Sequence, residues 1–441
     1  MSLGEILSKL FQQRSLSKNR FIRESGIDRS TFYQILRGKR MPTDQQMICI
    51  LHYLDAGEDE EALIDLFERE KSGNEKWRNG QIIRAFLRQR PKFFDGEIQA
   101  CSDQSKKILD VLCREAENGG ELYAFFPLTL LKKELMNGWM LRISSICRKK
   151  FRASFFLLIE KGNEEKDTNT ETLIAVLQEC LACIANQNIQ LNVYPDSSES
   201  GMYRNVPFPY CLIASETLLL FRADGRRITR MLRLQKPEMI AAYREHFMAR
   251  QQSSAPIIST GLDYEDLASY LFRLWSGAAG KKAYLLHPRP CVAHYVTEAL
   301  IERYVERRQQ DFIKQYCALF RAVEFYEFVP EEGLSDFLRD RTVLENGLQM
   351  KLRQEDFLGL RGKMEERYGS RLFFIKPVSE LLKDKTIVLI EHQELLILPH
   401  NGFHYMLRIS EPDIVKIFSE WFSGRLSGLN NDVDLRKEWH R

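Results

Sequence analysis

The sequence predicts a multidomain protein with an all-α head, a helical connector and two repeated α/β lobes. At 441 residues, and with domains of roughly 100 to 200 residues, the chain has room for two to four domains. Short apolar stripes at helical spacing fill the first 70 residues, and two further helical patterns follow. From about residue 119 onward, strand-like and helix-like runs alternate, which is typical of α/β lobes.

The composition excludes several classes of protein. A 44% hydrophobic and 28% charged composition is that of a globular chain, neither disordered nor fibrous. No stretch approaches the roughly 18 consecutive apolar residues that cross a bilayer, and the N-terminal stretch becomes polar too soon for a signal peptide. We therefore expect a cytoplasmic protein without a membrane partner.

The charges are distributed unevenly. Residues 1–40 hold nine basic and three acidic residues, a net charge of +6, whereas residues 55–70 carry a net charge of −7. A basic segment of this kind is suited to phosphate. The acidic segment should face away from it.

The head, residues 1–70, reads as a series of short helices. Residues 3–11 have an apolar face, and Ser17 is a good N-cap for a second helix that ends at Gly26. Gly26 can adopt a positive φ, so the chain can turn there. Asp28 can cap the next helix, which runs to Gly38, and Pro42 and Thr43 open another.

Two short helices joined by a glycine turn are typical of a helix-turn-helix motif, so the sequence predicts an all-α helix-turn-helix head. The run SKNRFIRESGIDRSTFYQILRGKRMP and the helix after it resemble the Cro/C1-type (XRE) family of DNA-binding domains, over about 70 of the 441 residues. The resemblance depends on Gly26, Ile27, Phe32 and Ile35. Two residues depart from the family pattern. Ile22 stands where the family usually has a small residue, and Lys18 stands where glutamine is common.

The resemblance implies double-stranded DNA as a partner, with the second helix of the motif in the major groove. Arg29 suits a bidentate contact with guanine and Gln34 one with adenine. Phosphates would be contacted by Lys18, Arg37, Lys39 and Arg40. The DNA-binding set is Lys18, Arg29, Ser30, Thr31, Tyr33, Gln34, Arg37, Lys39 and Arg40. The alternative is a set of solvated charges on a helical bundle that contacts protein.

Residues 71–118 are expected to form a helical connector. An apolar stripe in residues 98–112 could pack on the lobes or on a second chain. The second possibility leads to the hypothesis that the protein is a homodimer.

The chain then repeats itself. MLRLQKPEMIAAYREHF (231–247) matches MLRISEPDIVKIFSEWF (406–422) without a gap. Upstream, CLIASETLLLF (211–221) parallels VLIEHQELLIL (388–398), and YAFFP (123–127) parallels YLLHP (284–288). We expect lobe 1 at 119–250, a linker at 251–279, lobe 2 at 280–424 and a polar tail at 425–441.

Catalytic motifs are missing from the lobes. Their tandem arrangement loosely resembles a degenerate phospholipase D-like pair, a family in which each half supplies an HxKxxxxD motif. None of the eight histidines is followed by lysine two residues later; His287 comes nearest, with His294 in place of the aspartate. The phosphate-binding loop, GxSxG, HExxH and GxGxxG motifs are also missing, so we expect no enzyme activity and no cofactor.

Other candidate sites are weaker. Cys180 and Cys183 have CxxC spacing but lie in an apolar helical stripe, and His392, His400 and His404 are loosely spaced, so no metal site is expected. Arg233 and Arg408 occupy equivalent places in the repeats. They could face each other across a pseudo-two-fold axis and bind an anionic ligand, or each could form a structural salt bridge.

Together these observations predict a sequence-specific transcription regulator whose repeated lobes sense a small-molecule or protein effector or mediate oligomerisation. Two alternatives stay open. One is a phosphodiesterase or nuclease delivered by the head, and the other is a protein-interaction scaffold.

Overall fold

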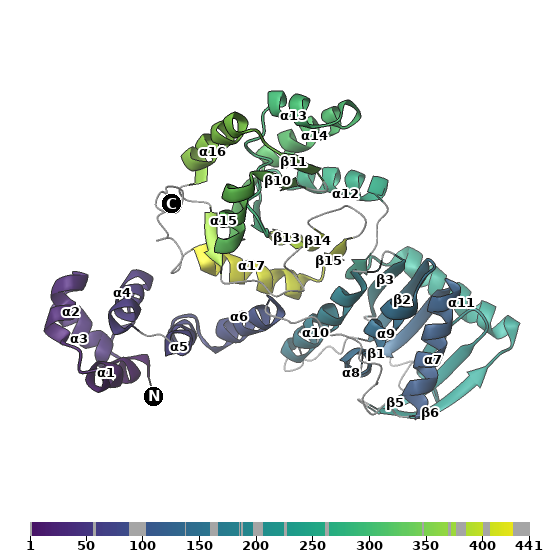
Figure 1. Ribbon diagram of the computed structural model, residues 1–441. Helices are drawn as coiled ribbons and strands as arrows, with labels where there is room; N and C mark the ends of the chain where they lie inside the picture. The colour runs from purple at the N-terminus through teal and green to yellow at the C-terminus, as the bar shows by residue number, and fades with distance from the viewer. Residues whose placement is uncertain are drawn as a thin grey trace. The chain divides into compact units, whose positions relative to one another are not determined.

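The computed structural model describes residues 2–55, 59–87, 103–136, 138–158, 166–184, 186, 188–196, 206–224, 227–260, 264–345, 348–368, 372–375, 385–399 and 406–426. The chain forms two compact units (Figure 1). Unit 1 comprises residues 1–85 and 420–441, and unit 2 comprises residues 86–419. Each unit is described by itself.

Unit 1 is built from short helices. They are α1 (Leu3–Gln13), α2 (Lys18–Ser25), α3 (Arg29–Leu36), α4 (Asp44–Leu54), α5 (Glu60–Ser72) and most of α6 (Asn74–Leu87), joined by the end of α17 (Pro412–Leu426). One apolar cluster contains buried side chains from α1 to α5. The acidic helix α5 contributes Leu63 and Phe67 to this cluster, and Glu70 accepts a hydrogen bond from the Leu3 amide at 2.8 Å.

Unit 2 is organised around one 13-stranded mixed sheet in the described residues, in the order β12-β9-β8-β13-β14-β15-β7-β3-β2-β1-β4-β5-β6. The strands are β1 (Glu121–Pro127), β2 (Phe151–Leu158), β3 (Ile189–Asp196), β4 (Tyr210–Ile213), β5 (Leu218–Asp224), β6 (Arg227–Leu234), β7 (Ile258–Thr260), β8 (Lys282–Leu286), β9 (Glu324–Pro330), β12 (Leu372–Ile375), β13 (Lys385–Ile390), β14 (Glu394–Pro399) and β15 (Leu407–Ile409). A separate hairpin pairs β10 (Thr342–Glu345) with β11 (Leu348–Lys351).

Helices connect these strands. They are α7 (Asp103–Asn118), α8 (Leu128–Met136), α9 (Trp139–Ile146), α10 (Lys166–Ile184), α11 (Pro237–Ser253), α12 (Tyr264–Gly277), α13 (Glu298–Tyr304), α14 (Arg307–Arg321), α15 (Glu331–Asp340), α16 (Gln354–Tyr368) and the first part of α17. In the part of the chain that is described, no helix combines the length and apolar character needed to cross a bilayer.

The two halves of the sheet repeat one topology. The order β3-β2-β1-β4-β5-β6 in the first half corresponds to β12-β9-β8-β13-β14-β15 in the second. In each half three parallel strands are followed by three that pair antiparallel. The register also repeats at the last pair, where Arg233 lies opposite Leu219 and Arg408 lies opposite Leu396.

The fold class predicted from the sequence is wrong in its architecture. The halves are not two separate lobes, because β7 pairs with β3 of the first half and with β15 of the second and makes the sheet continuous. The segment 251–279, in which a linker was expected, carries β7 and α12. Its polar composition concealed β7, which has only three residues.

The expected helical connector is also not a separate element. Helix α7 packs on the sheet of unit 2, and its buried Glu115 accepts hydrogen bonds from the amide of Ser215 at 3.0 Å and from its hydroxyl at 2.7 Å. A second buried bond joins Ser105 of α7 to Glu134 of α8. Helix α6, by contrast, lies mainly in unit 1. The residues between them, 88–102, are outside the described part of the chain, as is Cys101.

Candidate nucleic-acid interface

The α2–turn–α3 segment is fixed by its caps and its turn. Ser17 caps α2 by accepting from the Arg20 amide at 3.3 Å, and Asp28 caps α3 by accepting from the Thr31 amide at 3.0 Å. Gly26 has φ +67°, the left-handed conformation that favours glycine. Both cap predictions and the predicted turn are confirmed.

The hydrogen bonds at the start of α3 hold Asp28 in its charged form. The Ser30 hydroxyl donates to Asp28 at 2.6 Å, and this bond, together with the Thr31 amide, lowers the pKa of the carboxyl below its usual value. A charged carboxylate at this position also interacts favourably with the positive end of the helix dipole.

Aromatic packing fixes the orientation of α3. Phe32 is fully buried, and its ring centroid lies 5.3 Å from that of Phe11 in α1 and 4.7 Å from that of Phe21 in α2. The ring of Tyr53 in α4 also packs against Phe11 and Phe21, with centroid distances of 6.0 and 5.0 Å. With Phe32, Ile35 and Leu36 directed into this core, the opposite face of α3 is left to solvent.

That outward face carries the residues predicted to contact DNA. Arg29, Ser30, Gln34 and Arg37 are exposed, and Thr31 and Tyr33 are half-buried. The guanidinium of Arg29 lies 5.9 Å from the ring centroid of Tyr33, which braces it one turn along the helix. The structure therefore places these side chains on the same side of α3, five of them within the helix and Arg37 at its C-cap.

The remaining predicted residues flank this face. Lys39 and Arg40 are exposed just after α3, and Arg40 donates to the hydroxyl of Thr31 at 3.3 Å. Lys18 opens α2 and lines a depression of about 380 Å³, whose other lining residues are Phe11, Gln12, Ser15, Leu16, Ser17, Asn19 and Tyr33.

The exposed charges around α3 are mainly positive. Three neighbouring carboxylates are engaged in ion pairs, Glu24 with Arg20, Asp44 with Lys71 and Asp59 with Arg14. Within the described residues, no ion pair is formed by Lys18, Arg23, Arg29, Arg37, Lys39 or Arg40. The basic side chains around α3 are thus free of ion pairs in this part of the chain, and Asp28, the carboxylate at the start of α3, is hydrogen-bonded as its cap.

Gly4 is a positioning residue that the sequence did not reveal. A Cβ at this position would lie 2.3 Å from the carbonyl oxygen of Ile35 and 2.6 Å from the amide of Gly38. Glycine therefore allows α1 to cross directly over the end of α3. A single glycine within an apolar stripe carries no recognisable signal, because the contact depends on tertiary packing.

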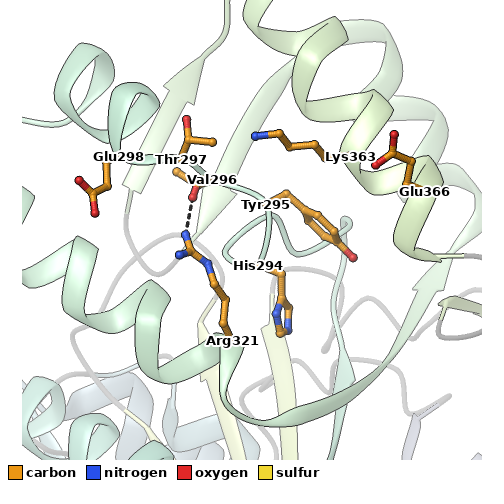
Figure 2. Close-up of a pocket in the computed structure, with 8 residues that line it drawn as sticks. All are labelled: His294, Tyr295, Val296, Thr297, Glu298, Arg321, Lys363 and Glu366. Atoms are coloured by element: carbon orange, nitrogen blue, oxygen red, sulfur yellow. Dashed lines mark hydrogen bonds between the residues drawn. The ribbon is translucent and has the colours of Figure 1, made fainter.

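Unit 2 contains a polar pocket of about 630 Å³ (Figure 2). Arg321 at the end of α14 donates to the Val296 carbonyl at 2.6 Å, and Lys363 and Glu366 of α16 line the side opposite Arg321. The ring of His294 packs 4.7 Å from Phe320 and 5.0 Å from Phe325. The lining carries both signs of charge and does not define one ligand.

Arg233 and Arg408, proposed as a shared ligand site, are not brought together. Six strands separate β6 from β15, so at about 4.8 Å per strand the two residues lie on the order of 30 Å apart. Arg408 pairs with the buried Glu394 at 2.7 Å and lies over the Tyr270 ring. Arg233 is exposed on an edge strand. The pseudo-two-fold arrangement fails because the halves join through β7, which pairs with non-equivalent strands of the two halves.

The remaining candidates form no site in the described residues. Burial raises the pKa of Cys180 to about 12, which makes it a poor nucleophile or metal ligand. His287 contacts Thr386 at 3.3 Å. No group of three or more metal-binding side chains is found in the described ranges, and His400 and His404 lie outside them.

Comparisons with known proteins do not identify a family. No family model matches the chain, so the assignment to the Cro/C1-type family is not supported and is withdrawn, as is the phospholipase D-like one. No curated protein matches either. A solved structure of polyphosphate kinase from Porphyromonas gingivalis aligns at 9% identity with a TM-score of 0.21, over 70% of this chain and 46% of that one. The chain thus spans less than half of that structure, and this TM-score assigns neither fold nor activity.

Proposed function

We propose that the protein binds double-stranded DNA sequence-specifically through α3 and acts as a transcription regulator. The observation that carries the proposal is the outward face of α3. It presents polar and basic side chains on a helix whose inner face packs into an aromatic core, and these basic side chains form no ion pair within the described residues. An α-helix of this kind fits the major groove of B-DNA.

The geometry suggests a division of roles. Arg29 and Gln34 end in planar groups that match the edges of guanine and adenine, and both are exposed on α3. Lys18, Arg37, Lys39 and Arg40 lie at the ends of the helices, where they would contact phosphates and set the position of α3.

The much larger unit 2 would regulate this binding. In a homodimer, two copies of α3 would need to match half-sites about 34 Å apart. An effector bound to unit 2, for which the mixed-charge pocket beside Arg321 is available, would favour one arrangement of the paired helices.

The experiment that tests the proposal is selection from a pool of random 30-bp duplexes with the full-length protein. We expect enrichment of one motif and weaker binding of that motif by the Gln34→Ala and Arg29→Ala variants. Arg307→Ala, at an exposed position in unit 2, serves as the matched control and should bind like the wild type. Failure to enrich any motif, with no duplex retained at low salt, would reject the proposal and favour a protein-docking role for unit 1.

A further inference from the structure

Among the described residues, no strand pairs with the outer edge of β6 in the sheet of unit 2. Strand β6 is the last strand in the sheet order and pairs only with β5 in the described part of the chain. Figure 1 shows the β5–β6 hairpin at the far end of this sheet. An open edge offers unpaired backbone amides and carbonyls to an incoming strand.

The equivalent edge in the second half is occupied. Strand β15 corresponds to β6 in order and in register, and its second edge pairs antiparallel with the extended segment β7. In that ladder Leu407 lies opposite Thr260 and Ile409 lies opposite Ile258. The duplicated fold thus already accepts an added strand at this position once.

Apolar side chains are exposed where their counterparts are covered. Leu232 is 41% exposed, whereas the equivalent Leu407 is fully buried. Met239, in the first turn of α11, the helix that follows β6 in the chain, is 37% exposed, whereas its counterpart Ile414 is fully buried. The uncovered edge therefore leaves apolar surface that a bound segment would remove from water.

The same edge is strongly basic. Arg222 on β5, Arg227, Arg230 and Arg233 on β6, and Lys236 just after it are all exposed, and none forms an ion pair within the described residues. Asp224 is the one acidic residue described on this hairpin. This charge favours an acidic partner.

We propose that the β6 edge binds an extended acidic segment of a partner protein, which pairs antiparallel with β6 as β7 pairs with β15. Backbone hydrogen bonds give the register, aliphatic side chains of the segment cover Leu232 and Met239, and its carboxylates neutralise the arginines. A second copy of this chain fits poorly, because β6–β6 pairing would bring two arginine-rich strands of like charge side by side. Nucleic acid would leave the two apolar side chains uncovered. This inference does not depend on the proposed DNA binding.

The test uses full-length protein and a fluorescein-labelled peptide of roughly eight residues that alternates glutamate and isoleucine, the pattern of an added strand. We expect saturable binding by anisotropy, with hydrogen–deuterium exchange showing new protection of the amides in residues 227–234. The Arg230→Gln/Arg233→Gln variant, which keeps hydrogen-bonding side chains, should weaken binding roughly tenfold or more. Arg307→Gln, remote from this edge in sequence and exposed on α14, should bind like the wild type.

Several results would overturn the proposal. Binding without new protection in 227–234 would show a charge contact rather than strand addition. Equal binding of a lysine–isoleucine peptide would exclude recognition of acidic side chains. A dimer that Leu232→Asp dissociates would identify a second copy as the occupant. Loss of binding to a random 30-bp duplex in the Arg230→Gln/Arg233→Gln variant, with no peptide binding, would make this edge a nucleic-acid surface.

Discussion

Two glycines shape the motif around α3 for different physical reasons. Gly26 needs its backbone conformation, whereas Gly4 needs the space that a side chain would occupy. A Cβ at position 26 would meet no atom within 4 Å. Gly26→Ala should therefore lower the free energy of unfolding only by the strain of a left-handed residue, about 1–2 kcal/mol. Gly4→Ala should cost more, because two backbone groups must move. Chemical denaturation of both variants measures the difference, and equal losses would contradict the close approach of α1 and α3.

Asp28 should make part of the stability of unit 1 depend on pH. Its pKa is lowered in the folded protein, so its contribution is fully present above the unfolded value of 3.8 and is lost as pH falls through the folded pKa. Asp28→Asn can keep the cap without the charge. The wild type and Asp28→Asn should therefore differ less in unfolding midpoint as pH is lowered from 6 to 3. A difference that stays constant over this range would contradict the lowered pKa of Asp28.

Arg233 and Arg408 occupy equivalent positions in the repeat but have different surroundings, which the repeated sequence does not show. Arg408 is half-buried, and although burial alone would lower its pKa, hydrogen bonding to Glu394 raises it overall. Arg408→Met would remove the cationic partner of the buried Glu394, which would keep the hydrogen bonds from Tyr270 and Gln393, and should cost roughly 2 kcal/mol of stability. Arg233→Met should change stability little, because its side chain is exposed. Thermal unfolding of the two variants measures the difference in stability. A larger loss for Arg233→Met than for Arg408→Met would contradict the structural role given to the Arg408–Glu394 pair.

At the scale of elements, much of the α2–α3 motif could be predicted from the sequence. Ser17, Gly26 and Asp28 act through neighbours only a few residues away, so local chemistry shows their roles. The position of β7 could not be predicted in this way. Its three residues pair with strands more than 60 residues before and more than 140 residues after it, and such pairing leaves no local pattern.

The short strand β7 should couple the two halves of unit 2. Ile258 is fully buried and lies in ladders with both β3 and β15. Ile258→Ala should cost about 2–5 kcal/mol, as is typical of large-to-small substitutions in a core. Hydrogen exchange should then show lower protection in both β3 and β15, and loss in one strand alone would contradict a sheet that is continuous through β7.

At the scale of the whole molecule, the two units separate the proposed tasks. Unit 1 presents a rigid basic helix face, and unit 2 offers a pocket and an open edge for regulation. The repeated motifs predicted duplication, and the strand order repeats accordingly. How the halves join was not predictable, because β6 and β15 share the MLR sequence but lie beside different neighbours.

The central claim is that α3 reads base edges. The most direct measurement is the affinity of wild type, Gln34→Ala and Lys39→Ala for a panel of single-base-pair variants of the selected motif, at several salt concentrations. Gln34→Ala should abolish discrimination at one position, a loss of about 1–3 kcal/mol, and leave the others intact. Lys39→Ala should weaken all sequences alike and reduce the salt dependence by about one phosphate contact. If both variants weaken all sequences equally, α3 does not read the bases.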